Sequence, residues 1–213
     1  DLVGVTLLVT AGGTEEDVDP VRILGNRSTG RMGFAIAARG AARGAAVTLV
    51  SGPSTLETPV GVERVDVRSA REMEASITSR RDGVDAIVMA AAVADYRPAE
   101  AALHKLKKGG GPMRLELVEN PDILAGLGEW REGRRPALVG FALETENVVQ
   151  NARSKLQRKR VDLVVANHAA DALGGDTNRV TLVSADADEE LPLLDKRAVA
   201  DRILDRIVAL TAG

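Results

Sequence analysis

Short apolar runs alternate with longer amphipathic stretches through most of this chain, and this alternation constrains the fold more than any other feature. Six runs are expected to be strands: Val5–Thr10, Ala46–Ser51, Val62–Val67, Ala86–Ala91, Ala137–Phe141 and Leu163–Ala166. Most are apolar on both faces, as strands buried in a parallel sheet are. The pattern predicts a Rossmann-like α/β fold, with a mostly parallel sheet and helices on both of its faces.

Helices are predicted between the strands and at the end of the chain. They are expected at Gly30–Arg43, from a capping box at Ser69–Glu72, at Asn147–Lys159 and at Lys196–Leu210. After Asn167 the pattern changes, because a glycine-rich turn leads into short apolar runs at 179–184 and 190–194. These runs predict a small carboxyl-terminal β-hairpin, which the last helix closes.

The length and composition fit one domain over residues 1–213. A net charge of −3 and an aromatic content of 2% argue against nucleic acid as a partner, since a basic surface and stacking platforms are both missing. The chain has no cysteine, and no stretch approaches the roughly 20 apolar residues of a membrane span. We expect a soluble, cytoplasmic protein with no membrane partner. Because it starts at Asp1, we expect either a trimmed chain or part of a longer polypeptide.

One long segment fits neither the strand nor the helix pattern. Residues 94–111 contain Pro98, few apolar side chains and the run Lys105-Leu106-Lys107-Lys108-Gly109-Gly110-Gly111. Long loops of this kind often form active-site lids, so we predict a mobile flap at about 95–112. A lysine on such a flap can neutralise phosphate charge in a transition state, although a run of three lysines is more often a solvated surface.

Two glycine-rich turns follow the first predicted strand. The first, Thr10–Thr14, contains Gly12 and Gly13, and the second, Gly25–Gly33, opens the first predicted helix. Glycine lets backbone N–H groups approach phosphate, and a helix N-terminus favours negative charge. The alternatives are a tight turn with positive φ at Gly12 or Gly13, and a plain N-cap at Ser28 or Thr29.

Several charged residues are candidates for ligand binding. Asp95 follows a buried strand and is suited to Mg²⁺ or a ribose hydroxyl, or is an ordinary turn residue. Arg22 is suited to gripping a carboxylate or phosphate, or to pairing with a nearby aspartate. Lys155 and Lys159 stand one helical turn apart, which suits phosphate contact and surface solvation equally.

Missing residue types exclude several enzyme classes. Two histidines and no cysteine are too few for most zinc sites, so metal catalysis would have to use Mg²⁺. The single tyrosine, Tyr96, is followed by Glu100 at the position where many reductases have a lysine. The chain also lacks the G-x-S-x-G motif of α/β-hydrolases.

Taken in order, the motifs resemble those of bacterial phosphopantothenoylcysteine synthetases. They are Thr10-Ala11-Gly12-Gly13-Thr14, Asp19-Pro20-Val21-Arg22, Asn26-Arg27-Ser28-Thr29-Gly30, Ala90-Ala91-Ala92-Val93-Ala94-Asp95-Tyr96-Arg97, Lys105-Leu106-Lys107-Lys108, Asn120-Pro121-Asp122-Ile123 and Gly140-Phe141-Ala142-Leu143-Glu144-Thr145. The likeness covers nearly the whole chain. It implies a two-step ligation in coenzyme A synthesis, in which 4'-phosphopantothenate attacks the α-phosphate of CTP. The amine of cysteine then displaces CMP from the acyl-cytidylate.

The resemblance also implies roles for individual residues. Asn26 and Lys105 correspond to catalytic positions, Lys105 also contacting the nucleotide, and Arg22, Ala91 and Ala92 correspond to the phosphopantothenate site. Nucleotide contacts fall on Asp95, Pro121, Asp122, Ile123, Leu124, Phe141, Lys155 and Lys159. Gly12 and Gly13 of the first glycine turn are expected to contact the nucleotide as well, through their backbone N–H groups. Asp95 would also hold Mg²⁺, the expected cofactor beside the co-substrate CTP.

The chain departs from the family pattern near the first glycine turn. Glu15-Glu16-Asp17 stands where Arg-Glu-Pro is expected, and the added negative charge makes this turn the weaker anion site. Family members form dimers, so we expect a homodimer, with Arg158–Arg160 or the terminal hairpin near the shared edge. In bacteria the domain is commonly fused to a flavin-dependent phosphopantothenoylcysteine decarboxylase, which is the expected fused or associated partner.

Two other functions are compatible with the α/β pattern. One is a nicotinamide- or flavin-binding oxidoreductase, and the other is a nucleotide-binding regulatory module without catalysis. Titration with NADPH and with CTP distinguishes the oxidoreductase from the ligase. Replacement of Lys105 should abolish the turnover of a ligase, whereas a regulatory module has no turnover to lose.

Overall fold

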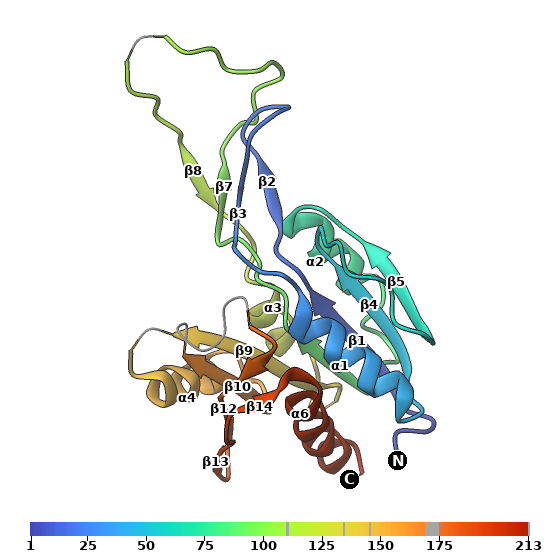
Figure 1. Cartoon of the computed structure of the whole chain (residues 1–213). Helices are drawn as coiled ribbons and strands as arrows, with labels where there is room; N and C mark the ends of the chain where they lie inside the picture. Colours follow the sequence, from blue (N-terminus) through green and yellow to red (C-terminus); the bar gives the residue numbers. More distant parts are fainter. Residues whose placement is uncertain (110, 134, 145, 169–174, 213) are drawn as a thin grey trace.

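A computed structural model of the chain describes residues 1–109, 111–133, 135–144, 146–168 and 175–212. Gly110 of the predicted flap, Thr145 of the last motif and Gly174 of the predicted turn lie outside these ranges. The centre of the fold is a sheet of eight strands in the order β13-β12-β10-β9-β6-β1-β4-β5 (Figure 1). Six neighbouring strands are parallel, and β12 and β13 are antiparallel, which confirms the predicted α/β class.

The six predicted strands are all present in the parallel part of the sheet. They are β1 (Thr6–Ala11), β4 (Ala46–Ser51), β5 (Val62–Asp66), β6 (Ala86–Met89), β9 (Ala137–Glu144) and β10 (Leu163–His168). The largest difference is at β9, which continues three residues beyond the predicted Phe141, and β6 ends two residues before the predicted Ala91. Ala90 donates to Val88 O and Ala91 donates to Thr10 Oγ1, so the chain turns out of the sheet there.

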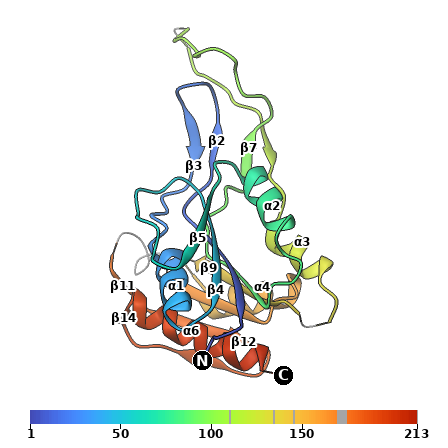
Figure 2. The ribbon, with the colours of Figure 1, turned by 90° about the vertical axis from the view of Figure 1, so that its right-hand side faces the viewer.

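Helices cover both faces of the sheet, as predicted. On one face lie α1 (Arg31–Ala42) and α6 (Lys196–Thr211), which share a core with β1, β6, β9 and β10. On the other lie α2 (Ala70–Thr78), α3 (Ile123–Trp130) and α4 (Val148–Arg158), packed over a second core. Both layers are visible after a quarter turn (Figure 2). Helix α3 has no counterpart among the predicted elements, since its eight residues are too short for a clear helical period.

The capping prediction for α2 is confirmed in part. Ser69 Oγ accepts a hydrogen bond from the N–H of Glu72 at 3.2 Å, as a capping box requires. The carboxylate of Glu72 accepts from the N–H of Arg68 instead of that of Ser69. The helix start is further held by Glu16, a buried residue whose carboxylate accepts from the N–H of Ala70 at 2.9 Å.

The predicted terminal hairpin is correct in kind and wrong in detail. β12 (Val180–Ser184) pairs with β13 (Asp188–Glu190), so the second strand begins before the predicted run at 190–194. The hairpin also extends the main sheet, because β12 pairs antiparallel with β10. Residues 194–195 form β14, which pairs with β11 (Thr177–Asn178). Burial of Leu182 against the main core decides this arrangement, which the local pattern does not encode.

A protruding arm extends from the carboxyl edge of the sheet (Figures 1 and 2). It consists of residues 15–25, which form the hairpin β2 (Glu15–Asp17) and β3 (Ile23–Gly25), and of residues 96–109 and 111–119, which include β7 (Tyr96–Pro98) and β8 (Leu117–Glu119). The predicted flap therefore starts with a paired strand, where no regular structure was predicted. Its mobility stays a prediction.

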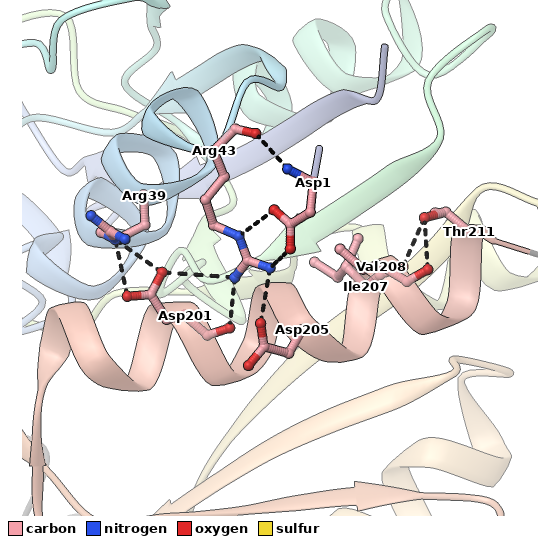
Figure 3. Close-up of polar contacts among 8 residues, drawn as sticks. All are labelled: Asp1, Arg39, Arg43, Asp201, Asp205, Ile207, Val208 and Thr211. Carbon is pink, nitrogen blue, oxygen red and sulfur yellow. Dashed lines mark hydrogen bonds and ion pairs between the residues drawn. The ribbon is translucent and has the colours of Figure 1, made fainter. Parts of the chain in front are cut away.

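The two helices of the first face are joined by ion pairs (Figure 3). Arg43, at the end of α1, binds the carboxylate of Asp1 at 2.6 Å, that of Asp205 at 2.8 Å and the main-chain oxygen of Asp201 at 3.0 Å. Arg39 binds the carboxylate of Asp201 at 2.9 Å. These contacts fix α6 against α1 and the first residue. Among the described residues, no helix is long and apolar enough to cross a membrane.

Candidate active site

A cavity of about 1030 Å³ opens at the carboxyl ends of β6, β9 and β10, where parallel α/β sheets bind ligands. It brings together residues that lie far apart in the sequence. The predicted site residues on its wall are Asn26, Ala91, Ala92, Asp95, Pro121, Asp122, Ile123, Leu124, Phe141, Lys155 and Lys159.

The chain after β6 builds the floor of this cavity. The N–H of Ala92 donates to Gly12 O at 2.8 Å, and its carbonyl accepts from the N–H of Thr14 at 3.2 Å. Gly12 has φ of +79°, and a Cβ there would lie 3.0 Å from Gly52 O. The first glycine turn thus uses its backbone to connect β1 to the floor, and positive φ at Gly12 confirms the simpler interpretation of that turn.

Asn26 reaches over the same floor. Its Nδ2 donates to the carbonyls of Ala92 at 3.1 Å and Val93 at 3.2 Å. Within the described part of the chain, Asn26 Oδ1 accepts no hydrogen bond. In this state the amide offers an acceptor, and it can donate to a reacting carbonyl only by exchanging one of these two bonds.

The second glycine turn brings the start of α1 close to the end of β1. A Cβ on Gly33 would lie 2.6 Å from both the Ala11 Cβ and the Thr10 oxygen. The N-cap of α1 is Gly30, with φ of +77°, so the alternative of an N-cap at Ser28 or Thr29 is wrong. Within the described residues, Ser28 Oγ accepts a hydrogen bond from the N–H of Gly30 alone. No acidic side chain occupies the first turn, which leaves the helix start favourable for an anion.

Two lysines stand on the α3–α4 side of the cavity. Lys155 donates to the carbonyl of Phe141 at 2.6 Å, and Lys159 forms an ion pair with Asp122. Burial lowers the pKa of Lys155, and the nearby charge of Lys159 adds to this effect, against the opposing attraction of Asp122. An ammonium that is partly desolvated in this way gains more from a bound anion than an exposed one does.

Asp122 stabilises the start of α3 and also lies on the cavity wall. Its carboxylate caps α3, because Oδ1 accepts from the N–H of Ala125 at 3.0 Å. Burial raises the pKa of Asp122, but the hydrogen bond from Lys159 and the cap outweigh it, so the pKa is lowered overall. The carboxylate therefore stays charged and holds Lys159 at the cavity.

Asp95 is exposed at the mouth of the cavity, where the N–H of Asn120 binds its main-chain oxygen at 2.8 Å. Within the described ranges, no group of three or more histidine and acidic side chains is arranged so that it could hold a metal ion. A lone carboxylate suits Mg²⁺, which is commonly held by one or two carboxylates together with substrate phosphates.

Four predicted site residues lie outside the cavity wall. Gly12 connects β1 to the cavity floor through its carbonyl, and Gly13 lines a smaller hollow of about 280 Å³. Arg22 and Lys105 lie on the arm, where Arg22 binds Asp19 and the carbonyl of Leu106. Their roles in binding and catalysis stay predictions.

The cavity also has residues that sequence reasoning did not select. On the α1–α6 side lie Lys196, Asn167 and Asn178, beside Arg31, whose guanidinium binds Asp176 at 2.6 Å. The Oδ1 atoms of Asn167 and Asn178 are buried and have no partner within the described residues. A signal was available for Lys196, because a lysine that follows an N-cap aspartate lies at a helix start. For Asn178, only the pairing of β11 with β14 reveals the position.

Comparisons with known proteins find matches over nearly the whole chain. The family model described as DNA/pantothenate metabolism flavoprotein C-terminal domain matches residues 2–210. The coenzyme A biosynthesis bifunctional protein CoaBC of Escherichia coli strain K12 is 46% identical over 214 residues, covering 98% of this chain and 52% of that protein. Its namesake from Mycobacterium tuberculosis strain H37Rv is 46% identical over 226 residues, covering 100% and 54%. The chain thus spans about half the length of the curated relatives it matches.

Solved structures show the same fold. The crystal structure of the C-terminal domain of CoaBC matches with a TM-score of 0.85 and 40% identity, covering 98% of this chain and 96% of that one. A Cab2 mutant in complex with phosphopantothenate-cysteine matches with a TM-score of 0.81, covering 98% and 88%. The latter is 18% identical, so its likeness is one of fold alone.

Proposed function

The chain belongs to the family of DNA/pantothenate metabolism flavoprotein C-terminal domains, and from this premise we propose that it joins 4'-phosphopantothenate to L-cysteine with CTP. The product is the amide, and pyrophosphate and CMP are released. The observation that carries the proposal is one cavity that collects eleven of the predicted site residues from five separate segments of the chain. This ligase is favoured over an oxidoreductase because relatives named for coenzyme A biosynthesis match the whole chain.

The cavity suits the first step, in which a carboxylate attacks the α-phosphate of CTP. Two negatively charged reactants must be brought together, so cations and N–H groups must offset their repulsion. Lys155 and Lys159 supply positive charge on one side, and the start of α1 with Arg31 and Lys196 supplies it on the other. Mg²⁺, bound with the nucleotide phosphates, would neutralise further charge, and Asp95 is the residue we assign to hold it.

The second step is the attack of the cysteine amine on the acyl carbonyl. The amine must lose a proton, and the carbonyl oxygen must be stabilised as its charge develops. We assign Asn26 to this carbonyl, because its amide lies over the cavity floor beside Ala91 and Ala92. Lys105 is assigned to charge neutralisation in the activation step, and it must approach the cavity from the arm.

A pyrophosphate-release assay tests the proposed function on the full chain. Pyrophosphate is expected only when CTP, Mg²⁺ and 4'-phosphopantothenate are all present, and amide only after cysteine is added. ATP in place of CTP tests the nucleotide preference. A folded protein that releases no pyrophosphate with all three present contradicts the proposal, and tighter binding of NADPH than of CTP would favour the oxidoreductase instead.

The arm is the surface that we assign to a homodimer. Twelve large apolar side chains are exposed in the described part of the chain, and seven lie on the arm: Val21, Ile23, Tyr96, Leu103, Met113, Leu115 and Leu117. Such a concentration favours a protein partner. The surfaces expected from the sequence are less suitable, because Lys159 faces the cavity and β13 is an acidic edge strand. A fused or associated decarboxylase domain and a cytoplasmic location are the further expectations for this ligase.

A further inference from the structure

The tip of the β2–β3 hairpin holds one residue of the flap, Leu106, by both of its main-chain polar groups. Asp19 Oδ2 accepts from the N–H of Leu106 at 3.1 Å, and Arg22 Nη1 donates to the carbonyl of Leu106 at 3.0 Å. The same Nη1 also binds Asp19 Oδ2, so the aspartate and the arginine form one unit. Two side chains here provide the pair of hydrogen bonds that a neighbouring strand would normally provide.

Asp19 is built into the hairpin tip. Its Oδ1 accepts from the N–H groups of Val21 at 2.8 Å and Arg22 at 2.9 Å, and the residue is only 1% exposed. Burial of a carboxylate is tolerated only where it is paired and hydrogen-bonded, and this one is saturated by four N–H donors. One of the four comes from the flap, so the flap completes the site of the aspartate.

Lys105 lies between two anchored points of the flap. The residue after it is Leu106, and three residues before it the N–H of Ala102 donates to the carbonyl of Val18 at 3.0 Å. Lys105 itself is exposed, and within the described ranges its ammonium has no hydrogen bond or ion pair. The backbone of Lys105 is therefore fixed to the hairpin while its side chain stays free.

We propose that Asp19 is a positioning residue for Lys105, which it holds in place through the main-chain N–H of Leu106, while Arg22 holds the carbonyl of Leu106 as the second half of the clamp. This proposal rests on the proposed ligase function for the task of Lys105. The physical reason is the entropic cost of ordering a charged side chain on a long loop. When the backbone of Lys105 is fixed in advance, fewer rotations are left to restrict in the transition state.

A protease experiment tests the clamp without any assay of activity. Trypsin cleaves after lysine, and the Lys105–Leu106 bond contains the clamped N–H. With Asp19→Ala we expect cleavage there to be about tenfold faster, because local opening exposes the bond. The cleavage rate of Asp19→Asn should lie between those of the wild type and Asp19→Ala, since an amide oxygen still accepts from Leu106 but binds Arg22 less strongly. Asp17→Ala is the matched control, because Asp17 lies on the same hairpin and binds Arg68 instead.

Hydrogen exchange of the Leu106 N–H gives a second measurement on the same proteins, and circular dichroism verifies that each variant is folded. Slower exchange in the wild type than in Asp19→Ala, with Asp17→Ala like the wild type, supports the clamp. Equal exchange and equal cleavage in wild type and Asp19→Ala overturn it.

Kinetics test whether the clamp serves the reaction. Asp19→Ala should lower kcat for pyrophosphate release by about 10- to 100-fold, the range expected for small misplacement of a catalytic group, while KM for CTP stays within about threefold. Asp19→Asn should recover part of the loss. In the Lys105→Ala background, Asp19→Ala should cost nothing more, because the group that it positions is gone.

The outcomes keep the two proposals apart. If the wild type releases no pyrophosphate, the proposed function fails, and cleavage and exchange still decide whether the clamp exists. If the wild type is active and Lys105→Ala is equally active, or if Asp19→Ala slows both backgrounds by the same factor, positioning of Lys105 is overturned.

Discussion

At the residue scale, the side chains assigned to the site are held by contacts that the motifs do not display. Lys155 is a charged group set against the end of β9 through the carbonyl of Phe141. Asn26 is held by two main-chain carbonyls of the cavity floor. Spacing alone left Lys155 undecided between phosphate contact and solvation. Its half-buried position on the cavity wall favours phosphate contact, because a partly desolvated ammonium gains stability from an anionic partner in addition to the Phe141 carbonyl.

Replacement of Lys155 by methionine should weaken nucleotide binding. The change keeps the length of the side chain and removes one charge-assisted hydrogen bond of about 1.5–3 kcal/mol, which corresponds to a rise in Kd for CTP of about 10- to 100-fold. Isothermal calorimetry measures this directly. Arg153→Met is the control, because Arg153 lies on the same helix and pairs with Asp188 away from the cavity. Equal affinities in the two variants would remove Lys155 from the nucleotide site.

Asp19 should make the arm sensitive to strong acid only. Burial raises the pKa of Asp19, but hydrogen bonds from Val21, Leu106 and Arg22 outweigh it and lower the pKa from 3.8 to about 2. A carboxylate with a depressed folded-state pKa contributes stability above its unfolded pKa and loses it as the pH falls through the folded value. The difference in unfolding free energy between wild type and Asp19→Asn should therefore be constant above about pH 4 and shrink toward pH 2. Chemical denaturation at several pH values measures it, and a difference that does not change with pH contradicts the assignment.

At the element scale, the close approach of α1 to β1 determines the shape of the cavity. Gly33 faces Ala11 and the Thr10 oxygen with no room for a side-chain atom. The sequence shows a glycine cluster at this point, but helix starts and tight turns use glycine for different reasons. Only the packing of α1 on the strand shows that Gly30 caps the helix and that Gly33 permits the contact.

Gly33→Ala should destabilise the fold by about 1–3 kcal/mol, since the added methyl forces α1 away from β1. Urea denaturation measures the change. Gly126→Ala is the matched control, because that glycine is exposed in α3 with nothing within 4 Å of an added Cβ. The control should be stabilised by about 0.5–1 kcal/mol through helix propensity. A Gly33→Ala protein as stable as the wild type would show that the contact between α1 and β1 can accommodate a methyl group.

At the scale of the whole molecule, two features depend on segments that are distant in the sequence. Arg43 joins the first residue, α1 and α6, and its side chain is only 12% exposed. The arm carries a concentration of exposed apolar side chains away from the core. The first feature stabilises the chain itself, and the second favours association with another copy.

Arg43→Met should lower the free energy of unfolding by about 1–3 kcal/mol, because nearly buried ion pairs leave their carboxylates without a partner when the cation is removed. Thermal and chemical denaturation measure the loss. Arg39→Met removes a more exposed pair with Asp201 on the same helix, so it should cost less than about 1 kcal/mol. Equal losses in the two variants would contradict the importance of burial here.

Ile23→Glu combined with Leu117→Glu should convert the proposed homodimer into a monomer, because charged side chains in an apolar interface are left unpaired. Sedimentation equilibrium gives the mass. Val60→Glu is the control, since Val60 is 97% exposed and lies away from the arm. A wild type that is monomeric at micromolar concentration, or a double variant that stays dimeric, contradicts the arm as the interface.

The sequence by itself determined the α/β class, the six parallel strands and most helix bounds, because buried strands and helices have distinct apolar periods. Its motifs, through their family resemblance, also named eleven residues that the fold brings to one cavity wall, and the roles of these residues stay predictions. It did not determine the arm, the insertion of β12 beside β10, or the wall formed by Asn178 and Lys196. Those depend on which surfaces meet after folding. Leu106 shows the reason clearly, since its two hydrogen-bond partners lie 84 and 87 residues away, and no local pattern records a contact over that distance.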